Sequence, residues 1–397
     1  RIARGAAGQP GPFAHQAAVF NLAFTALAVV IAIVGWVLGG DAVNFLDVLV
    51  VAAPAGLIWA VPLAIQAGLA RTLQHGVYVR TGSVLERLAA LQSIAFAQTG
   101  IITTGDMQLD AVTAVAPHDK PTVLSIAAAL LQGSGSTQAR AVGAAATAAN
   151  LKLRRLKRVR ELTGSVRQAT ISGTVYYIGD RGSLEANGLV FPPKLKADAK
   201  PSLYVVTDEA ILGRLTFSDA LRPETIQTLE RLHDFDIRKT FLMAEGGHAA
   251  GEALADTVGI REVIALHTTA DKLRTLEAVH KRPMAFVGNG VADATLMSAV
   301  DIGISIGARA SNAASEAASV IVLRDNLALV AVMIAIARRT FGIARQAVAI
   351  VTGLSVLFMI LFAIAHFPAI YGVILVLIIE TAGLLLALRA HHSKISA

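Results

Sequence analysis

The sequence predicts a membrane protein that has two pairs of membrane-spanning helices and, between them, a parallel α/β domain interrupted by a smaller α+β domain. Of the 397 residues, 54% are hydrophobic, and the mean hydropathy of +0.60 is too high for an ordinary soluble domain. Four stretches are apolar enough to cross a bilayer, which takes about 20 residues. Between the second and third stretches, short apolar runs alternate with helical patterns.

The four apolar stretches form two hairpins, at residues 17–38 with 50–70 and at residues 347–367 with 368–388. The linkers inside the hairpins, "GGDAVNFLD" and "HFP", carry no Lys or Arg. The outer flanks carry Arg1, Arg4, Arg71, Arg80, Arg338, Arg339, Arg345 and Arg389. The positive-inside rule therefore predicts an integral membrane protein whose termini and long middle segment are cytoplasmic. The alternative, a very hydrophobic soluble core, would have to bury all four stretches.

The charge and the cysteine content of the chain exclude several kinds of site and partner. The chain has no Cys, which excludes disulfides and thiolate metal sites. The net charge of +7 is modest for this length, and basic cytoplasmic loops account for it, so we expect no nucleic-acid partner. The lipid bilayer is the partner that the composition implies.

The middle of the chain, residues 85–325, is polar enough to be soluble. Its apolar runs "SLYVVT", "KTFLMA", "PMAFVG", "DIGISIG" and "SVIVL" are short and mostly bounded by Gly, Asp or Thr, which predicts a parallel sheet with crossover helices. A first strand near Phe96 and a next one near Tyr204 are separated by a segment rich in Ala, Gly and Ser, which predicts an inserted domain. The expected divisions are 1–70, 71–107, 108–200, 201–326 and 327–397.

A basic run, "KLRRLKRVR", covers residues 152–160 of the expected insert. Such a run can bind phosphate-rich partners or lipid headgroups. We favour the alternative of a solvated strand or loop, because a single run of charges has little specificity.

The segment "FAQTGIITTGD", from Phe96 to Asp106, predicts a buried strand that ends in a Thr/Gly loop. Loops of this type bind phosphate through backbone N–H groups and hydroxyls. The position where a nucleophile would stand at the end of the strand is Ala97, so the loop has no reactive group there.

Several segments in collinear order resemble P-type cation-transporting ATPases, most closely the heavy-metal branch. They are residues 53–89, 96–106, 213–225 ("GRLTFSDALRPET"), 268–273 ("TTADKL") and 287–323. The resemblance covers essentially the whole chain. It implies a Rossmann-like, haloacid-dehalogenase-like phosphorylation domain with an inserted nucleotide-binding-type domain. It also implies ATP and Mg²⁺ as cofactors, and an actuator domain that missing sequence or a separate chain would supply.

The chain departs from the family pattern at the positions that carry out phosphorylation and bind magnesium in the family. Ala97 stands where the family has its phosphorylated Asp, and Gln98 stands where it has a Lys. The family's TGD loop aligns with "AEG", which ends at Gly246. At the magnesium position, Asn289 replaces an acid and Asp293 is retained. A methyl group cannot attack phosphorus, and Mg²⁺ prefers anionic oxygen ligands, so the resemblance implies a silent site.

Other positions of the family pattern are retained or altered. Thr99, Asp219 and Lys272 keep the periphery of the phosphate loop, including the family's phosphate-contacting lysine. The adenine-binding His-Pro pair aligns with Ser136 and its neighbour, and the glycine-rich turn aligns with "LTGSV" around Gly164. Gly179 is a further nucleotide-site candidate. We favour a small folded domain whose nucleotide pocket has drifted, which argues against ATP binding.

Two membrane residues define the expected transport path. Where the family has a Cys-Pro-Cys motif, this chain has Ala53, Pro54 and Ala55. Pro54 still frees a backbone carbonyl, but the sulfur ligands of the motif are absent. Glu380 lies deep in the last span, where a carboxylate should face the bundle interior. It is either an ion or proton ligand, or a protonated Glu hydrogen-bonded to a neighbouring helix.

Three functional hypotheses remain from the sequence. The first, which we favour, is a catalytically silent P-type ATPase homologue with a regulatory or scaffolding role. The second is an active ATP-driven metal or cation transporter whose actuator domain comes from missing sequence or another chain. The third is a membrane-tethered phosphatase of the same fold family, which needs the same Asp nucleophile and is lost with it.

Overall fold

The structure is a computed structural model that describes residues 12–40, 42–52, 55–162, 166–189, 200–244, 248–265, 269–307, 312–365 and 367–392. The chain divides into two compact units. One comprises Arg1–Ser93, Lys281–Ala285 and Met297–Ala397, and the other comprises Ile94–His280 and Phe286–Leu296.

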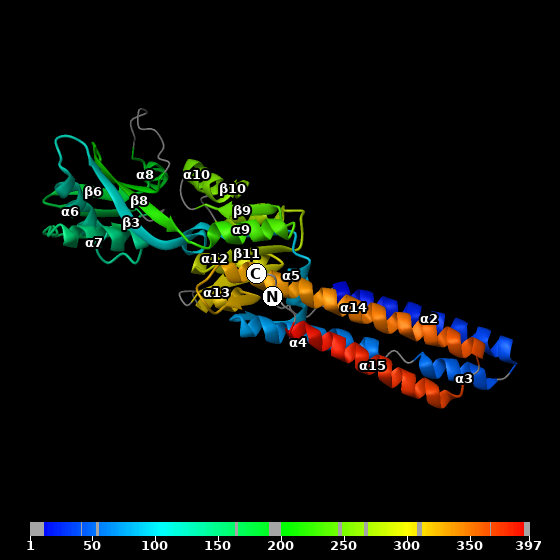
Figure 1. Ribbon diagram of the computed structural model, residues 1–397. Coiled ribbons are helices and arrows are strands. Elements are labelled where there is room, and N and C mark those ends of the chain that lie inside the picture. The colour runs from blue at the N-terminus through cyan, green and yellow to red at the C-terminus, as the bar shows by residue number, and fades with distance from the viewer. Residues whose placement is uncertain are drawn as a thin grey trace. The chain divides into compact units, whose positions relative to one another are not determined.

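The first unit contains a bundle of long apolar helices (Figure 1). These are α2 (Pro12–Gly39), α3 (Ala42–Val51), α4 (Ala55–Gln74), α14 (Ala328–Ala365) and α15 (Ala369–His392). In the described part of the chain, three helical segments are long and apolar enough to cross a membrane: Leu22–Gly39, Ala328–Ala365 and Ala369–Ala390. These match the first, third and fourth predicted spans. The second predicted span, residues 50–70, is divided between α3 and α4, and Pro54 lies outside the described residues.

The prediction that residues 39–47 form a linker is wrong for most of that segment, because α3 begins at Ala42. Val48 and Val51 of α3 are fully buried in a cluster with Phe24, Ala28 and other side chains of α2 and α14. Burial of this apolar face stabilises a helix where the polar residues Asn44 and Asp47 suggest a loop.

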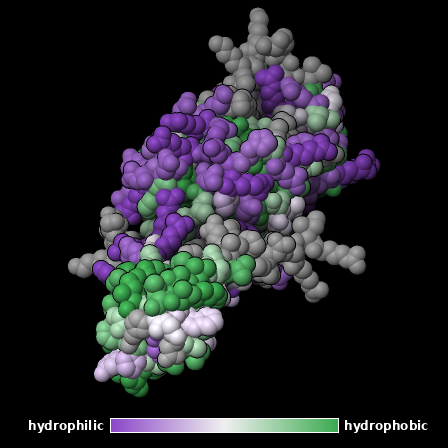
Figure 2. Space-filling view, turned by 90° about the vertical axis from the view of Figure 1, so that its right-hand side faces the viewer, coloured by the Kyte–Doolittle hydropathy of each residue, from purple (hydrophilic) through white to green (hydrophobic). Residues whose placement is uncertain are grey.

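Small residues let the helices of the bundle approach closely. Ala60 and Ala64 of α4 pack with Ala344 and Ala347 of α14 and with Ala387 of α15. Close contact between small residues is the usual means of helix association in a bilayer, where apolar burial gives little driving force. The outer faces carry exposed Leu, Ile and Val, and Figure 2 shows mainly hydrophobic side chains over these helices.

A seven-stranded sheet has the order β1-β13-β12-β11-β2-β9-β10. Its strands are β1 (Val77–Val79), β2 (Ser93–Ala97), β9 (Lys239–Met243), β10 (Glu262–Ile264), β11 (Met284–Gly288), β12 (Ile302–Ile306) and β13 (Val320–Val322). The pairs β9–β10 and β12–β13 are parallel, whereas β1 is antiparallel to β13. Phe96 and Phe286 lie in neighbouring strands, and the runs predicted at 239–244, 283–288, 301–307 and 319–323 are confirmed as strands.

Helices connect the successive strands of this sheet, as the alternating pattern predicts. They are α9 (Thr225–Asp234), α10 (His248–Val258), α11 (Thr269–Glu277), α12 (Val291–Ala299) and α13 (Asn312–Ala317), while α5 (Gly82–Ala89) precedes β2. The side chain of Thr81 caps α5 by accepting the backbone N–H of Val84.

A separate six-stranded antiparallel sheet has the order β3-β8-β7-β6-β5-β4. Its strands are β3 (Thr103–Ala114), β4 (Lys157–Glu161), β5 (Arg167–Ile171), β6 (Thr174–Gly179), β7 (Ser202–Val206) and β8 (Ile211–Leu221). Its helices are α6 (Lys120–Leu130), α7 (Thr137–Ala148) and α8 (Arg181–Ala186). This sheet extends beyond the predicted insert of residues 108–200 at both ends. Its long strand β3 begins directly after the phosphate-type loop, and its long strand β8 ends at Leu221.

The assignment of "SLYVVT" to the parallel sheet is wrong, because β7 lies between β6 and β8 in the antiparallel sheet. Leu203 and Val205 are buried in a core with α6, and Tyr204 and Val206 are buried with Val166 on the other face. Burial on both faces produces a continuous apolar run in either type of sheet, so the run alone does not identify its neighbours.

The basic run ends in β4, an edge strand in which every residue from Lys157 to Glu161 is exposed. The interpretation as a solvated strand is therefore confirmed for this part of the run. Charged side chains on an edge strand also hinder pairing with other chains.

Candidate functional site

The candidate site is built on the turn that follows β2. All five residues of β2 are buried, and Ala97 and Gln98 expose only 4% and 6% of their surfaces. The chain then turns through Gln98–Ile102, where Gly100 has a φ of +78°, and enters β3 at Thr103. A side chain at Gly100 would be strained by this φ, and its Cβ would lie 2.5 Å from Nδ2 of Asn289. The turn therefore needs glycine.

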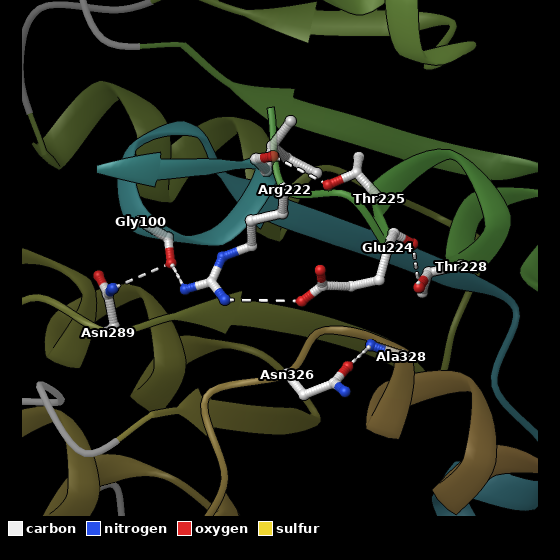
Figure 3. Close-up of polar contacts among 9 residues, drawn as sticks. Gly100, Arg222, Glu224, Thr225, Thr228, Asn289, Asn326 and Ala328 are labelled. Carbon is white, nitrogen blue, oxygen red and sulfur yellow. Dashed lines mark hydrogen bonds and ion pairs between the residues drawn. The ribbon is translucent and has the colours of Figure 1, made fainter. Parts of the chain in front are cut away.

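Two side chains from distant parts of the sequence hold the Gly100 carbonyl. Arg222 donates to it from Nη2 at 2.8 Å, and Asn289 donates from its amide nitrogen at 3.2 Å (Figure 3). Arg222 also forms an ion pair with Glu224 at 3.6 Å. Because a carboxylate has no proton to donate at neutral pH, the second of these contacts depends on the amide at position 289.

Asp219 fixes the start of β3 to β8. It accepts hydrogen bonds from Thr103 Oγ1 at 2.5 Å, from the backbone N–H of Gly105 at 3.1 Å and from Thr104 Oγ1 at 3.4 Å. Burial raises the pKa of the Asp219 carboxyl, whereas these hydrogen bonds act in the opposite direction. The retained acid is engaged in holding two long strands together.

Asp293 closes the turn between β11 and α12. Its Oδ2 accepts the backbone N–H groups of Asn289 at 3.0 Å and of Gly290 at 2.8 Å. A Cβ at Gly288 would lie 2.6 Å from the same oxygen, so this glycine makes room for the carboxylate. Burial raises the pKa of Asp293, opposed by these hydrogen bonds and by the charge of Lys272.

Lys272 and Thr99 complete the retained periphery. Lys272, on α11, approaches the Ala244 carbonyl at 3.4 Å, and its charge acts on Asp293. The hydroxyl oxygen of Thr99 is buried and has no hydrogen-bond partner in the described part of the chain. Gly246 and Gly164 lie outside the described residues.

The residues present at the magnesium position do not fit that ion. Mg²⁺ needs an octahedral shell of oxygen ligands, commonly including one or two carboxylates. Asn289 turns its amide nitrogen to the Gly100 carbonyl, and Oδ2 of Asp293 is occupied by two N–H groups. Among the described residues, no group of three His, Cys, Asp or Glu side chains is placed to hold a metal.

The two described nucleotide-site candidates have structural roles. Ser136 is the N-cap of α7, where its hydroxyl accepts the N–H of Ala139 at 3.1 Å. Gly179 ends β6, and a Cβ there would lie 2.8 Å from Val166 Cγ2. The missing side chain at Gly179 thus makes room for the core of the domain itself.

In the bundle, Glu380 of α15 is half-buried. Two more deeply buried polar residues, Asn44 and Asp47 of α3, were not predicted from the sequence; they expose 7% and 6% of their surfaces. Their spacing of three residues, continued by Val48 and Val51, places them on one helix face. Extending the helical pattern back through the expected linker would have revealed them.

Comparison with known proteins shows which proteins this chain resembles. No family model matches the chain. It is 28% identical over 330 residues to the "Probable cadmium-transporting ATPase" of Staphylococcus aureus (strain MRSA252), which covers 80% of this chain and 45% of that protein. It is also 28% identical over 319 residues to the "Zinc/cadmium/lead-transporting P-type ATPase" of Escherichia coli (strain K12), covering 79% of this chain and 43% of that protein. The chain is a homologue of the heavy-metal P-type ATPases. It spans less than half the length of these relatives.

Solved structures show the same fold for this ATPase homologue. A zinc-transporting PIB-type ATPase in the E2.Pi state superposes with a TM-score of 0.73 at 24% identity, covering 98% of this chain and 66% of that one. The catalytic domain of the CPx-ATPase CopB-B superposes with a TM-score of 0.54 at 18% identity, covering 67% of this chain and 97% of that one. The membrane part and the cytoplasmic part thus both have counterparts among the P-type ATPases.

Proposed function

We propose that this P-type ATPase homologue is catalytically silent and acts in a regulatory or scaffolding role in the membrane. The observation that carries the proposal is Ala97, whose methyl group lies buried at the end of β2, where the family pattern has its phosphorylated Asp. Without a carboxylate there, no aspartyl phosphate forms, and the covalent step of ion pumping is lost.

The surroundings of Ala97 support the same conclusion. Gln98 supplies no positive charge to an incoming phosphate, and the Asn289 amide is bonded to the Gly100 carbonyl. Phosphoryl transfer depends on positioning and charge stabilisation, and both are reduced here. ATP and Mg²⁺, which the homologues imply for the family, would therefore have few of their usual partners.

The proposed arrangement in the cell follows from helix lengths and arginine distribution. The chain crosses the membrane four times, with α3 and α4 together forming the second span. Both termini and the haloacid-dehalogenase-like domain, with its insert near 108–200, are cytoplasmic. A separate chain or further sequence supplies an actuator domain where one is needed.

An active ATP-driven metal transporter is the alternative, and one observation favours it. The buried Thr99 hydroxyl has no hydrogen-bond partner among the described residues and stands two positions after Ala97. As a substitute nucleophile it would form a phosphate ester that hydrolyses too slowly for rapid turnover, and no general base is evident beside it in the described part of the chain.

ATP hydrolysis in proteoliposomes separates the two functions. The unmodified chain and Ala97→Asp are both expected to show no ATP hydrolysis stimulated by Zn²⁺ or Cd²⁺, because one restored part of a catalytic unit recovers little. A combined variant with Ala97→Asp, Gln98→Lys, Gly246→Asp and Asn289→Asp should regain slow phosphorylation. Metal-stimulated hydrolysis by the unmodified chain would establish the transporter instead.

A further inference from the structure

A pocket of about 650 Å³ lies at the start of strands β9 and β10. It is lined by one face of α9, the last turn of α10 and the residues that lead into the two strands, and all of these belong to the segment Ile94–His280 of one compact unit. Ala97, by contrast, ends a different strand, β2. The volume is in the range of about 300–1,000 Å³ that is typical of small-molecule sites, so the pocket can hold a ligand of its own.

The buried part of the pocket wall is apolar apart from one hydroxyl. Leu229, Ile237 and Val258 line the pocket and are buried. Thr240 also lines it and exposes 8% of its surface, and its hydroxyl has no hydrogen-bond partner within the described part of the chain. Because buried polar groups normally have a partner, a polar ligand in the pocket would supply the one that Thr240 lacks.

Three exposed carboxylates line the pocket, and two of them stand where a helix disfavours negative charge. Asp234 is the last residue of α9, and Asp256 lies in the last turn of α10. The C-terminal end of a helix carries a partial negative charge, so an acid there costs stability unless a cation neutralises it. Glu230 lies one turn before Asp234 on α9. Among the described residues, none of these three carboxylates takes part in an ion pair.

The basic side chains around the pocket do not balance these acids. Arg238 lines the pocket but forms an ion pair with Asp236 at 2.8 Å. Arg261 and His233 are the other basic groups of the lining. With Asp236 included, four carboxylates stand against two guanidinium groups and one imidazole. The excess of negative charge favours a cationic ligand.

The spacing of the carboxylates shows what kind of cation fits. No group of three His, Cys, Asp or Glu side chains among the described residues is placed to hold a metal ion, so these acids do not gather around a single ion. Glu230 and Asp234 are about 6 Å apart along α9, and Asp256 belongs to another helix. A ligand that reaches all three needs several positive centres on a flexible chain.

We propose that this pocket binds a linear polyamine. Its ammonium groups pair with Glu230, Asp234 and Asp256, and its methylene chain lies against apolar side chains such as Ile226, which is 48% exposed. The Thr240 hydroxyl accepts a hydrogen bond from one ammonium group. Binding would be independent of the residue at position 97 and would make the phosphorylation-type domain responsive to a small organic cation.

The test is binding of radiolabelled spermidine to the purified full chain in detergent, measured by equilibrium dialysis at constant ionic strength. Spermidine should bind about tenfold more tightly than butylamine, because one ammonium group pairs with only one carboxylate at a time. Asp234→Asn should weaken spermidine binding about threefold, and Asp234→Asn combined with Asp256→Asn about tenfold. Both variants should fold, since removing negative charge from a helix C-terminus is favourable.

Glu277→Gln is the matched control. Glu277 is exposed, is the last residue of α11 and belongs to the same unit, but it does not line the pocket. Its substitution should leave spermidine binding almost unchanged. Equal losses for Glu277→Gln and Asp234→Asn would overturn the site in favour of unspecific attraction to surface carboxylates. Equal affinities for spermidine and butylamine, or unchanged binding by the double variant, would overturn the polyamine assignment.

Discussion

The Gly100 carbonyl receives hydrogen bonds from Arg222 and from Asn289, and an acid at position 289 would turn one of these donors into an acceptor. Asn289→Asp should place two oxygens against each other and lower the free energy of unfolding by about 1–3 kcal/mol. The expected result is a lower thermal unfolding midpoint for the full chain in detergent, without added metal.

Asn326 provides the control for this substitution. Its side-chain oxygen accepts the N–H of Ala328 at 2.8 Å, so a carboxylate there keeps the contact (Figure 3). Asn326→Asp should leave the unfolding midpoint almost unchanged. Equal midpoints for Asn289→Asp and the unmodified chain would refute the role given to the amide.

Asp293 gives a prediction about pH. Because burial raises the pKa of its carboxyl, the folded protein keeps the proton to a higher pH than the unfolded chain does. The contribution of this group to stability is therefore largest below its ordinary pKa of 3.8 and is lost as the pH rises through the folded value. Asp293→Asn can keep both backbone hydrogen bonds through one oxygen and does not ionise. As the pH rises from 4, the thermal unfolding midpoint of this variant should increase relative to that of the unmodified chain. A difference between the two midpoints that does not change with pH would contradict this.

At the level of helices, the contact between α4 and α14 depends on the absence of a side chain at Gly68. Gly68→Ala would bring Cβ to 2.6 Å from Thr340 Oγ1 and should destabilise the bundle by about 1–3 kcal/mol. Gly342→Ala on α14 is the control, since among the described residues no atom from beyond the adjoining turns of its own helix lies within 4 Å of its Cβ position, and alanine should favour the helix there. Thermal unfolding in detergent should show opposite shifts, and two shifts of the same sign would argue against this packing.

The elements that the sequence predicted well are those with a strong local signal. The strands around Phe96, Phe286 and Ile304 are fully buried and bounded by turns, and the alternation of strand and helix along the chain predicted crossover helices between them. The strand at Tyr204 was placed in the wrong sheet because an apolar run does not show which strands flank it. At the site, the retained Asp219 and Asp293 were predicted, but the contact from Asn289 to Gly100 joins positions 189 residues apart and appears only in three dimensions.

At the scale of the whole molecule, the chain has a P-type ATPase fold, and Ala97 stands in its phosphorylation-type loop where the family pattern has the nucleophile. The membrane bundle, the seven-stranded sheet and the antiparallel sheet are all present, and Arg222, Asp219 and Asp293 hold the loop and its neighbouring turns in place. In the proposed silent homologue, Ala97, Gln98 and Asn289 lack the reactive and charged groups of the family pattern, while these supports remain. A fold kept intact in this way suits a binding or regulatory role.

The silent-enzyme proposal is tested most directly by measuring covalent phosphate on the protein. The purified, unmodified chain is incubated with radiolabelled ATP and Mg²⁺, precipitated with acid and treated with hydroxylamine. With a methyl group in place of the carboxylate, we predict no acid-stable, hydroxylamine-sensitive phosphate on the protein. A catalytically active heavy-metal P-type ATPase run in parallel shows that the assay detects an aspartyl phosphate. Magnesium-dependent covalent phosphate at any residue of the unmodified chain would contradict the silent-enzyme proposal and establish phosphoryl transfer.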